Sequence, residues 1–168
     1  MIPKKVINYL DSRGVKYEKV PHKQVFTTFD LANTLKEKMS KIAKTLLVKA
    51  DKKYVLVVLP AHYRLDMAKL KKVLKAKAIE LAPEKAMEKI LKVKPGALTP
   101  FAGLHKVEPY LDKALLKAEK AIFGAGSFTE SLRMKVKDLY KLEKMTVAEI
   151  SQAAKTKVKK VLAKKKKK

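Results

Sequence analysis

Lys44 is the residue of this chain whose type and position most directly suggest chemistry. It lies in an otherwise apolar run, between Ile42-Ala43 and Leu46-Leu47-Val48. A cation in such a place could point into a cleft and there bind a phosphate or polarise a carbonyl. The alternative is an edge-strand lysine whose stem covers apolar surface while its ammonium group stays in water. Taken alone, Lys44 fits this structural alternative better.

Two glycine-bearing turns are the next candidates, because apolar, strand-like residues lie beside each of them. The first contains Gly96 and, shortly after it, Thr99-Pro100-Phe101. The second runs through residues 124–130 with the sequence GAGSFTE. Glycine allows the backbone to approach a ligand closely, but glycines also build tight loops and β-bulges. Each turn alone is therefore explained equally well without a ligand.

Other kinds of site are not indicated. The three histidines, at positions 22, 62 and 105, have no metal-binding spacing, and the absence of cysteine excludes thiolate catalysis and disulfides. Residues 124–126 lack the third glycine and the following helix of a dinucleotide-binding fingerprint. Spacing does not exclude a Ser-His-Asp triad, but no serine has the context of a nucleophile elbow. We expect neither a bound metal nor a cofactor.

The composition predicts one globular domain with a substantial core. The chain has 168 residues, 47% of them hydrophobic, and no apolar run long enough to span a membrane. The first residues lack the apolar core of a signal peptide, so we expect a cytoplasmic protein without a membrane partner.

Charge is the other prominent feature of the composition. The net charge is +25, and the last fourteen residues contribute nine lysines and no acid, which leaves +16 on the remainder. Such a field favours polyanions such as nucleic acid. The alternative is that lysine is simply the default surface residue of this protein.

Hydrophobic periodicity and turn residues predict the elements that position these candidates. We expect helices over residues 3–13, 66–75, 83–91 and 137–142, a short helix capped by Thr28, and a final amphipathic helix capped by Thr146. We expect strands over residues 15–20, 43–49, 54–59, 78–81, 106–111, 121–123 and 129–136. The second and third strands form a hairpin, and the nearly all-apolar third strand should be central.

The order of these elements has no strict βαβ rhythm. It therefore predicts an α+β fold, a single compact domain with a mixed sheet flanked by helices. We expect this domain over residues 1–145. Over residues 146–168 we expect the final helix to run into a disordered, lysine-rich tail.

Four short motifs in order resemble the YbaK/prolyl-tRNA-synthetase-associated domain family. They are Lys-Thr-Leu at 44–46, Val-Val-Leu-Pro-Ala at 57–61, Gly-x-x-x-Pro-Phe at 96–101 and Gly-Ala-Gly-x-x-Thr-Glu-x-x-x-Met at 124–134. The resemblance covers residues 2–142. It implies a partly barrel-like sheet and the activity of an aminoacyl-tRNA deacylase, which hydrolyses the ester of mischarged tRNA in trans-editing and so protects translation fidelity.

The resemblance also implies roles for individual residues. Lys44 would be the residue most closely tied to activity, contacting the terminal adenosine phosphate or the ester carbonyl, with no protein side chain as covalent nucleophile. The remaining pocket residues would be Thr27, Thr28, Thr45, Gly96, Thr99, Pro100, Phe101, Gly124, Ala125, Gly126, Ser127 and Phe128. The partners would be the acceptor end of tRNA and a synthetase.

Two positions depart from the family pattern. Ala102 occupies the place of a glycine after Pro-Phe, with Gly103 following, and Phe128 stands where close relatives often carry histidine. These departures keep one alternative open, a catalytically inactive tRNA- or synthetase-binding module of the same fold, and the many lysines keep open a second, a general polyanion binder. The scattered aromatic residues and the absence of tryptophan argue against the second alternative.

Overall fold

The computed structural model of the chain describes residues 1–94 and 97–153. The helices are α1 (Lys4–Ser12), α2 (Thr28–Leu35), α3 (Met67–Leu74), α4 (Glu84–Leu91) and α5 (Val136–Leu142), with 3-10 turns at Met39–Lys41, Ala102–Leu104 and Lys113–Lys117. The strands are β1 (Glu18–Pro21), β2 (Ala43–Ala50), β3 (Lys53–Pro60), β4 (Tyr63–Leu65), β5 (Ile79–Leu81), β6 (Glu108–Asp112), β7 (Lys120–Gly124), β8 (Glu130–Lys135), β9 (Thr146–Ala148) and β10 (Ser151–Ala153).

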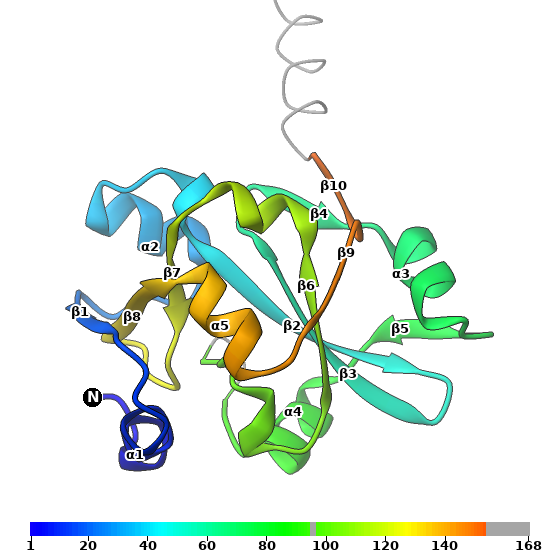
Figure 1. The fold of residues 1–168 in the computed structure, drawn as a ribbon, viewed down its shortest axis with the longest axis horizontal. Coiled ribbons are helices and arrows are strands. Elements are labelled where there is room, and N and C mark those ends of the chain that lie inside the picture. The colour runs from blue at the N-terminus through cyan, green and yellow to red at the C-terminus, as the bar shows by residue number, and fades with distance from the viewer. Residues whose placement is uncertain (95–96, 154–168) are drawn as a thin grey trace, which may run out of the picture.

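A long hairpin of β2 and β3 runs across the molecule and organises the larger sheet (Figure 1). The strand order is β5-β2-β3-β6-β9, with antiparallel pairing as far as β3 and parallel pairing beyond it. In β3, residues 55–60 are all buried, as their continuous apolar run predicts for a central strand. This confirms both the expected hairpin and the central position of its second strand.

A smaller antiparallel sheet, in the order β1-β8-β7, lies at one end of this hairpin (Figure 1). A parallel bridge between Ile42, just before β2, and Ile122 in β7 connects the two sheets. Because of this connection the strands curve around a shared core without forming a closed barrel. The α+β class and the mixed, partly barrel-like sheet are therefore confirmed.

The largest apolar cluster fills the space between α1, α5 and the smaller sheet. Val6 and Leu10 from one face of α1 pack there with Phe101, Phe123 and residues from α5. No helix within the described parts of the chain combines the length and the apolar character needed to cross a lipid bilayer.

Helix α2 begins one residue earlier than the sequence suggests. The hydroxyl of Thr27, and not that of Thr28, accepts the hydrogen bond from the Asp30 amide at 3.0 Å. Thr27 has the extended backbone of an N-cap residue, which leaves Thr28 as the first helical residue. The helix expected over residues 66–75 is confirmed as α3, and the side chain of Asp66 caps it by accepting from the Lys69 amide.

The prediction of a helix that starts at Thr146 is wrong for residues 146–153. Residues 146–148 form β9, which pairs in parallel with β6, and residues 151–153 form β10 against β4. The fully buried carboxylate of Asp112 explains the difference, because it accepts hydrogen bonds from the Ile150 amide at 3.0 Å and the Ser151 hydroxyl at 2.5 Å. These long-range bonds outweigh the local helical periodicity. The expected tail, residues 154–168, lies outside the described residues, so the division of the chain at residue 145 stays a prediction.

Candidate functional site

A pocket of about 270 Å3 lies where the start of β2 meets the segment before α2, the start of α4, the end of β7 and the start of β8. Six of the residues predicted from the sequence line it: Thr27, Thr28, Lys44, Thr45, Gly124 and Ser127. These residues come from three separate parts of the chain, and the junction of the two sheets brings them together.

Lys44 contributes the cation of this pocket. It is half-buried on β2, opposite Leu59, and its ammonium group makes no hydrogen bond or ion pair with any other residue that the structure describes. Burial lowers the pKa of the Lys44 ammonium below its usual 10.5, and the positive charge of Arg64 lowers this pKa further. An ammonium group without an acidic partner, held partly out of water, is suited to binding an anion or a developing negative charge.

Gly124 allows two parts of the pocket wall to approach each other. A Cβ at this position would overlap the backbone carbonyl oxygen of Leu98, which belongs to the loop after α4. Both residues line the pocket. The glycine is therefore required by close backbone packing between β7 and this loop.

The remaining predicted turn residues that the structure describes do not line the pocket. Gly96 lies outside the described residues. Four others are buried in the interior: Thr99, Pro100, Phe101 and Ala125. Gly126 has a positive φ of 84° and lies against Pro3, so it shapes the second turn. Thr99, Pro100 and Phe101 of the first turn thus belong to the buried interior and not to the pocket wall.

Phe128 lies at the edge of the site and not in its lining. Its ring packs against Phe26 with ring centroids 5.0 Å apart, and its backbone carbonyl accepts from the Val25 amide at 3.0 Å. Phe26 itself lines the pocket and is 59% exposed. The departure at Phe128 therefore creates an aromatic pair beside the pocket.

The departure at Ala102 does not alter the pocket wall, because neither Ala102 nor Gly103 is part of it. Ala102 is buried in a 3-10 turn, and the Gly103 amide donates to the Glu143 carboxylate at 2.8 Å. A Cβ at Gly103 would overlap the Tyr9 hydroxyl, which donates to the same carboxylate. This contact explains why the glycine is needed at 103 in this chain.

Sequence reasoning missed several pocket residues. The polar ones are His22, Glu84 and Ser131, and the apolar ones include Phe26, Met87 and Leu98. The alternation along residues 129–136 places Ser131 on the polar face of a half-buried strand, yet Ser131 is only 4% exposed. Both faces of β8 are covered at this point, which the period of two does not reveal. Among the described residues, no cluster of three or more His, Asp or Glu side chains could hold a metal ion.

Comparison with known proteins places this geometry in a family. A family model for the aminoacyl-tRNA editing domain matches residues 22–142. The proline–tRNA ligase of Bacillus subtilis (strain 168) is 33% identical over 116 residues, which are 68% of this chain and 20% of the ligase. The proline–tRNA ligase of Macrococcus caseolyticus (strain JCSC5402) is 31% identical over 108 residues, 64% of this chain and 19% of the ligase. The chain thus spans about a fifth of the length of these curated relatives.

Two solved structures share the fold. The hypothetical protein APE2540 superposes with a TM-score of 0.83 at 24% identity, covering 88% of this chain and 99% of the other. A protein described as a candidate trans-editing enzyme for prolyl tRNA synthetase superposes with a TM-score of 0.76 at 21% identity, covering 88% and 96%. Because the family model spans most of the residues that build the fold and the pocket, this chain belongs to the aminoacyl-tRNA editing domain family.

Proposed function

We propose that this protein is an aminoacyl-tRNA deacylase that hydrolyses the ester of mischarged tRNA in trans. The observation that carries the proposal is the unpaired Lys44 ammonium in the wall of a small pocket. Membership of the editing domain family indicates the class of substrate, and the Lys44 ammonium indicates how the pocket would promote hydrolysis of the ester.

The reaction needs charge stabilisation more than a strong nucleophile. Water adds to the ester carbonyl carbon, the carbonyl oxygen becomes negative, and the bond to the terminal ribose oxygen then breaks. That ribose oxygen takes one proton of the attacking water, the other proton passes to solvent, and the amino acid leaves as its carboxylate. The Lys44 ammonium stabilises the negative oxygen, and its partial burial weakens the screening by water.

The walls of the pocket favour a small amino acid side chain. A volume of about 270 Å3 must hold the aminoacyl group and part of the terminal ribose. Met87, Leu98 and Leu31 supply apolar surface. A synthetase pocket discriminates by only about 1–3 kcal/mol per methylene, so a second, size-limited site adds useful selectivity.

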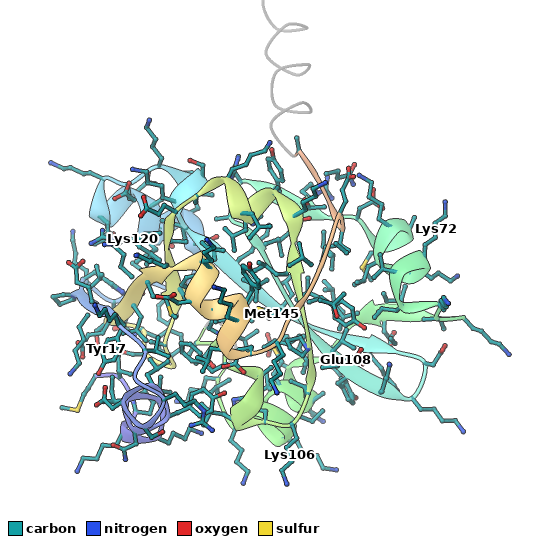
Figure 2. The ribbon with its side chains drawn as sticks, viewed as in Figure 1. Tyr17, Lys72, Lys106, Glu108, Lys120 and Met145 are labelled. Atoms are coloured by element: carbon teal, nitrogen blue, oxygen red, sulfur yellow. The ribbon has the colours of Figure 1, made fainter. Side chains whose placement is uncertain are left out.

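Basic surface residues would hold the tRNA backbone without reading its sequence. Lysine side chains project from several sides of the molecule, among them Lys72 and Lys106 (Figure 2). A polyanion as long as tRNA can contact many such groups at once. A synthetase is the second expected partner, and we expect the protein to act in the cytoplasm, where charged tRNA is used.

The test is a deacylation panel with tRNA charged with Ala, Ser, Thr, Cys or Pro. The variant Lys44→Met removes the charge and keeps the length of the side chain, and Lys49→Met makes the same change on the same strand outside the pocket. We expect turnover of one or two small aminoacyl esters and a loss of about 100-fold or more in kcat/KM for Lys44→Met. Lys49→Met should retain wild-type turnover. Equal rates for wild type and Lys44→Met would contradict the role of Lys44.

A binding module without turnover is the second candidate function. The observation that favours it is Phe128, which packs on Phe26 where close relatives often carry histidine. This candidate predicts salt-sensitive tRNA binding without hydrolysis of any ester in the panel.

A further inference from the structure

We propose that Ser131, oriented by His22, accepts a hydrogen bond from the α-ammonium group of the aminoacyl ester. The inference rests on the proposed function and adds a recognition element to the same pocket. It concerns two side chains that line the pocket and that the sequence does not single out.

The geometry around His22 fixes the direction of each hydrogen bond. His22 Nδ1 lies 2.7 Å from the Lys23 backbone carbonyl oxygen, and Nε2 lies 2.9 Å from Ser131 Oγ. A carbonyl oxygen can only accept, so Nδ1 carries the hydrogen and donates. In the neutral ring Nε2 is then an acceptor, and the Ser131 hydroxyl must donate to it.

This arrangement makes Ser131 an acceptor toward the pocket. Its one hydrogen is committed to His22, and its remaining lone pairs can only receive a hydrogen bond. Ser131 is 4% exposed, so an unmet acceptor here is costly, and a donor on the ligand is favoured.

Two other hydroxyls of the wall, those of Ser127 and Thr27, are already engaged, and the two that remain, on Thr28 and Thr45, are less buried than Ser131. Ser127 Oγ accepts from the amides of Thr129 and Glu130 and from the Met1 amino group. Thr27 Oγ1 is engaged as the cap of α2. Glu84 is the carboxylate of the pocket wall, and it is exposed at the start of α4. Ser131 is thus a buried acceptor with free capacity.

The donor that an aminoacyl ester brings is its α-ammonium group, which lies one carbon from the ester carbonyl. If Lys44 contacts the carbonyl oxygen, the ammonium lies in the same pocket, and Ser131 is part of the wall of that pocket. An N-acylated ester, such as that of peptidyl-tRNA, has no ammonium group. The Ser131 contact would therefore favour free aminoacyl esters over peptidyl esters.

The experiment measures the Kd of two stable analogues. One is 3′-(L-alanylamino)-3′-deoxyadenosine, and the other is the propanoylamino compound, which has hydrogen in place of the ammonium group. We expect wild type to bind the alanyl compound about tenfold more tightly, since hydrogen bonds to charged groups are the strong ones. In Ser131→Ala the two compounds should bind equally. Ser131→Cys, which keeps the shape but is a weak acceptor, should give the same result.

Glu84→Gln tests the carboxylate of the wall as another place where the ammonium could bind. The preference of wild type should survive this substitution within about twofold, because a single exposed charge contributes little. A preference that is lost in Glu84→Gln and kept in Ser131→Ala would overturn the proposal. So would an equal loss of affinity for both compounds in Ser131→Ala, or no preference in wild type.

Hydrolysis of alanyl-tRNA by the same preparations separates this inference from the proposed function. Turnover by wild type without the analogue preference overturns the ammonium contact alone. A preference that depends on Ser131, without turnover of any ester, supports the contact and contradicts the deacylase activity.

Discussion

A side chain at Gly124 would overlap the backbone carbonyl oxygen of Leu98, so the end of β7 and the loop after α4 meet at backbone distance. This contact joins the two glycine-bearing turns of the sequence. The end of β7 and the loop after α4 both contribute to the pocket wall and touch at this point. An atom added at Gly124 must therefore displace one of these two segments.

Gly124→Ala is therefore expected to change both stability and the pocket. We expect the free energy of unfolding to fall by about 1–3 kcal/mol, the usual cost of overpacking, and binding of the alanyl analogue to weaken. Urea denaturation and calorimetry check these two effects. Gly14→Ala is the control, because Gly14 has a φ of 66° but no neighbour near its Cβ position. It should cost about 1 kcal/mol through backbone strain alone and leave binding intact. Unchanged binding in Gly124→Ala would show that the contact does not shape the pocket.

Arg64→Gln is expected to raise the pKa of Lys44. Burial is the larger cause of the lowered pKa and stays in place, so the pKa of Lys44 should move only part of the way toward 10.5. The measurement is a titration of the Lys44 side-chain carbon next to the ammonium group, followed by NMR. A pKa that stays where it is in wild type would mean that burial alone lowers it.

Glu143→Gln is expected to alter the pH dependence of stability. Burial raises the pKa of Glu143 above 4.5, although hydrogen bonds from Gly103 and Tyr9 oppose this shift. The folded state then holds a proton that the unfolded chain has already released. The resulting stabilisation is complete below about pH 4.5 and is lost as the pH rises through the raised pKa.

Glutamine at position 143 cannot titrate, so it lacks this dependence. The free energy of unfolding of wild type, relative to Glu143→Gln, should be higher at pH 4 than at pH 7. Urea denaturation at both pH values measures the difference. A difference that is constant with pH would show that the pKa of Glu143 is the same in the folded and unfolded states.

Asp112→Ala tests the anchoring of the segment after α5. The substitution leaves the Ile150 amide and the Ser151 hydroxyl without their acceptor. Each unsatisfied buried group costs about 1–3 kcal/mol, so we expect a loss of at least about 2 kcal/mol and faster hydrogen exchange at Ile150. Asp112→Asn keeps one oxygen and should lose less. Equal stability of the alanine variant and wild type would mean that β10 does not depend on Asp112.

Deletion of residues 155–168 removes nine lysines and is expected to weaken tRNA binding, most strongly at low salt. If the pocket carries the activity, kcat should persist while the apparent KM rises. Turnover at several salt concentrations, compared with the full chain, separates the two parameters. Loss of most tRNA affinity without any turnover in the full chain would instead favour the polyanion binder.

The sequence alone determined the features that depend on neighbouring residues. Two mostly apolar, β-forming runs separated by a short polar turn produce the β2–β3 hairpin, and the side chain of Asp66 caps α3 because it can reach the Lys69 amide three residues away. Lys44 could also be singled out from its sequence neighbours, because it is a cation within an otherwise apolar run. The family motifs follow the chain order and are equally visible without a structure.

Only the tertiary structure decided which distant residues meet. Residues 146–153 form strands and not the expected helix because the Asp112 carboxylate binds the Ile150 amide and the Ser151 hydroxyl. Ser131 is buried because other elements pack against both faces of β8. The pocket itself exists because a bridge between Ile42 and Ile122 joins two sheets. Local periodicity reports how a segment divides apolar from polar surface. It carries no information about which hydrogen-bonding partner, tens of residues away, will complete that segment.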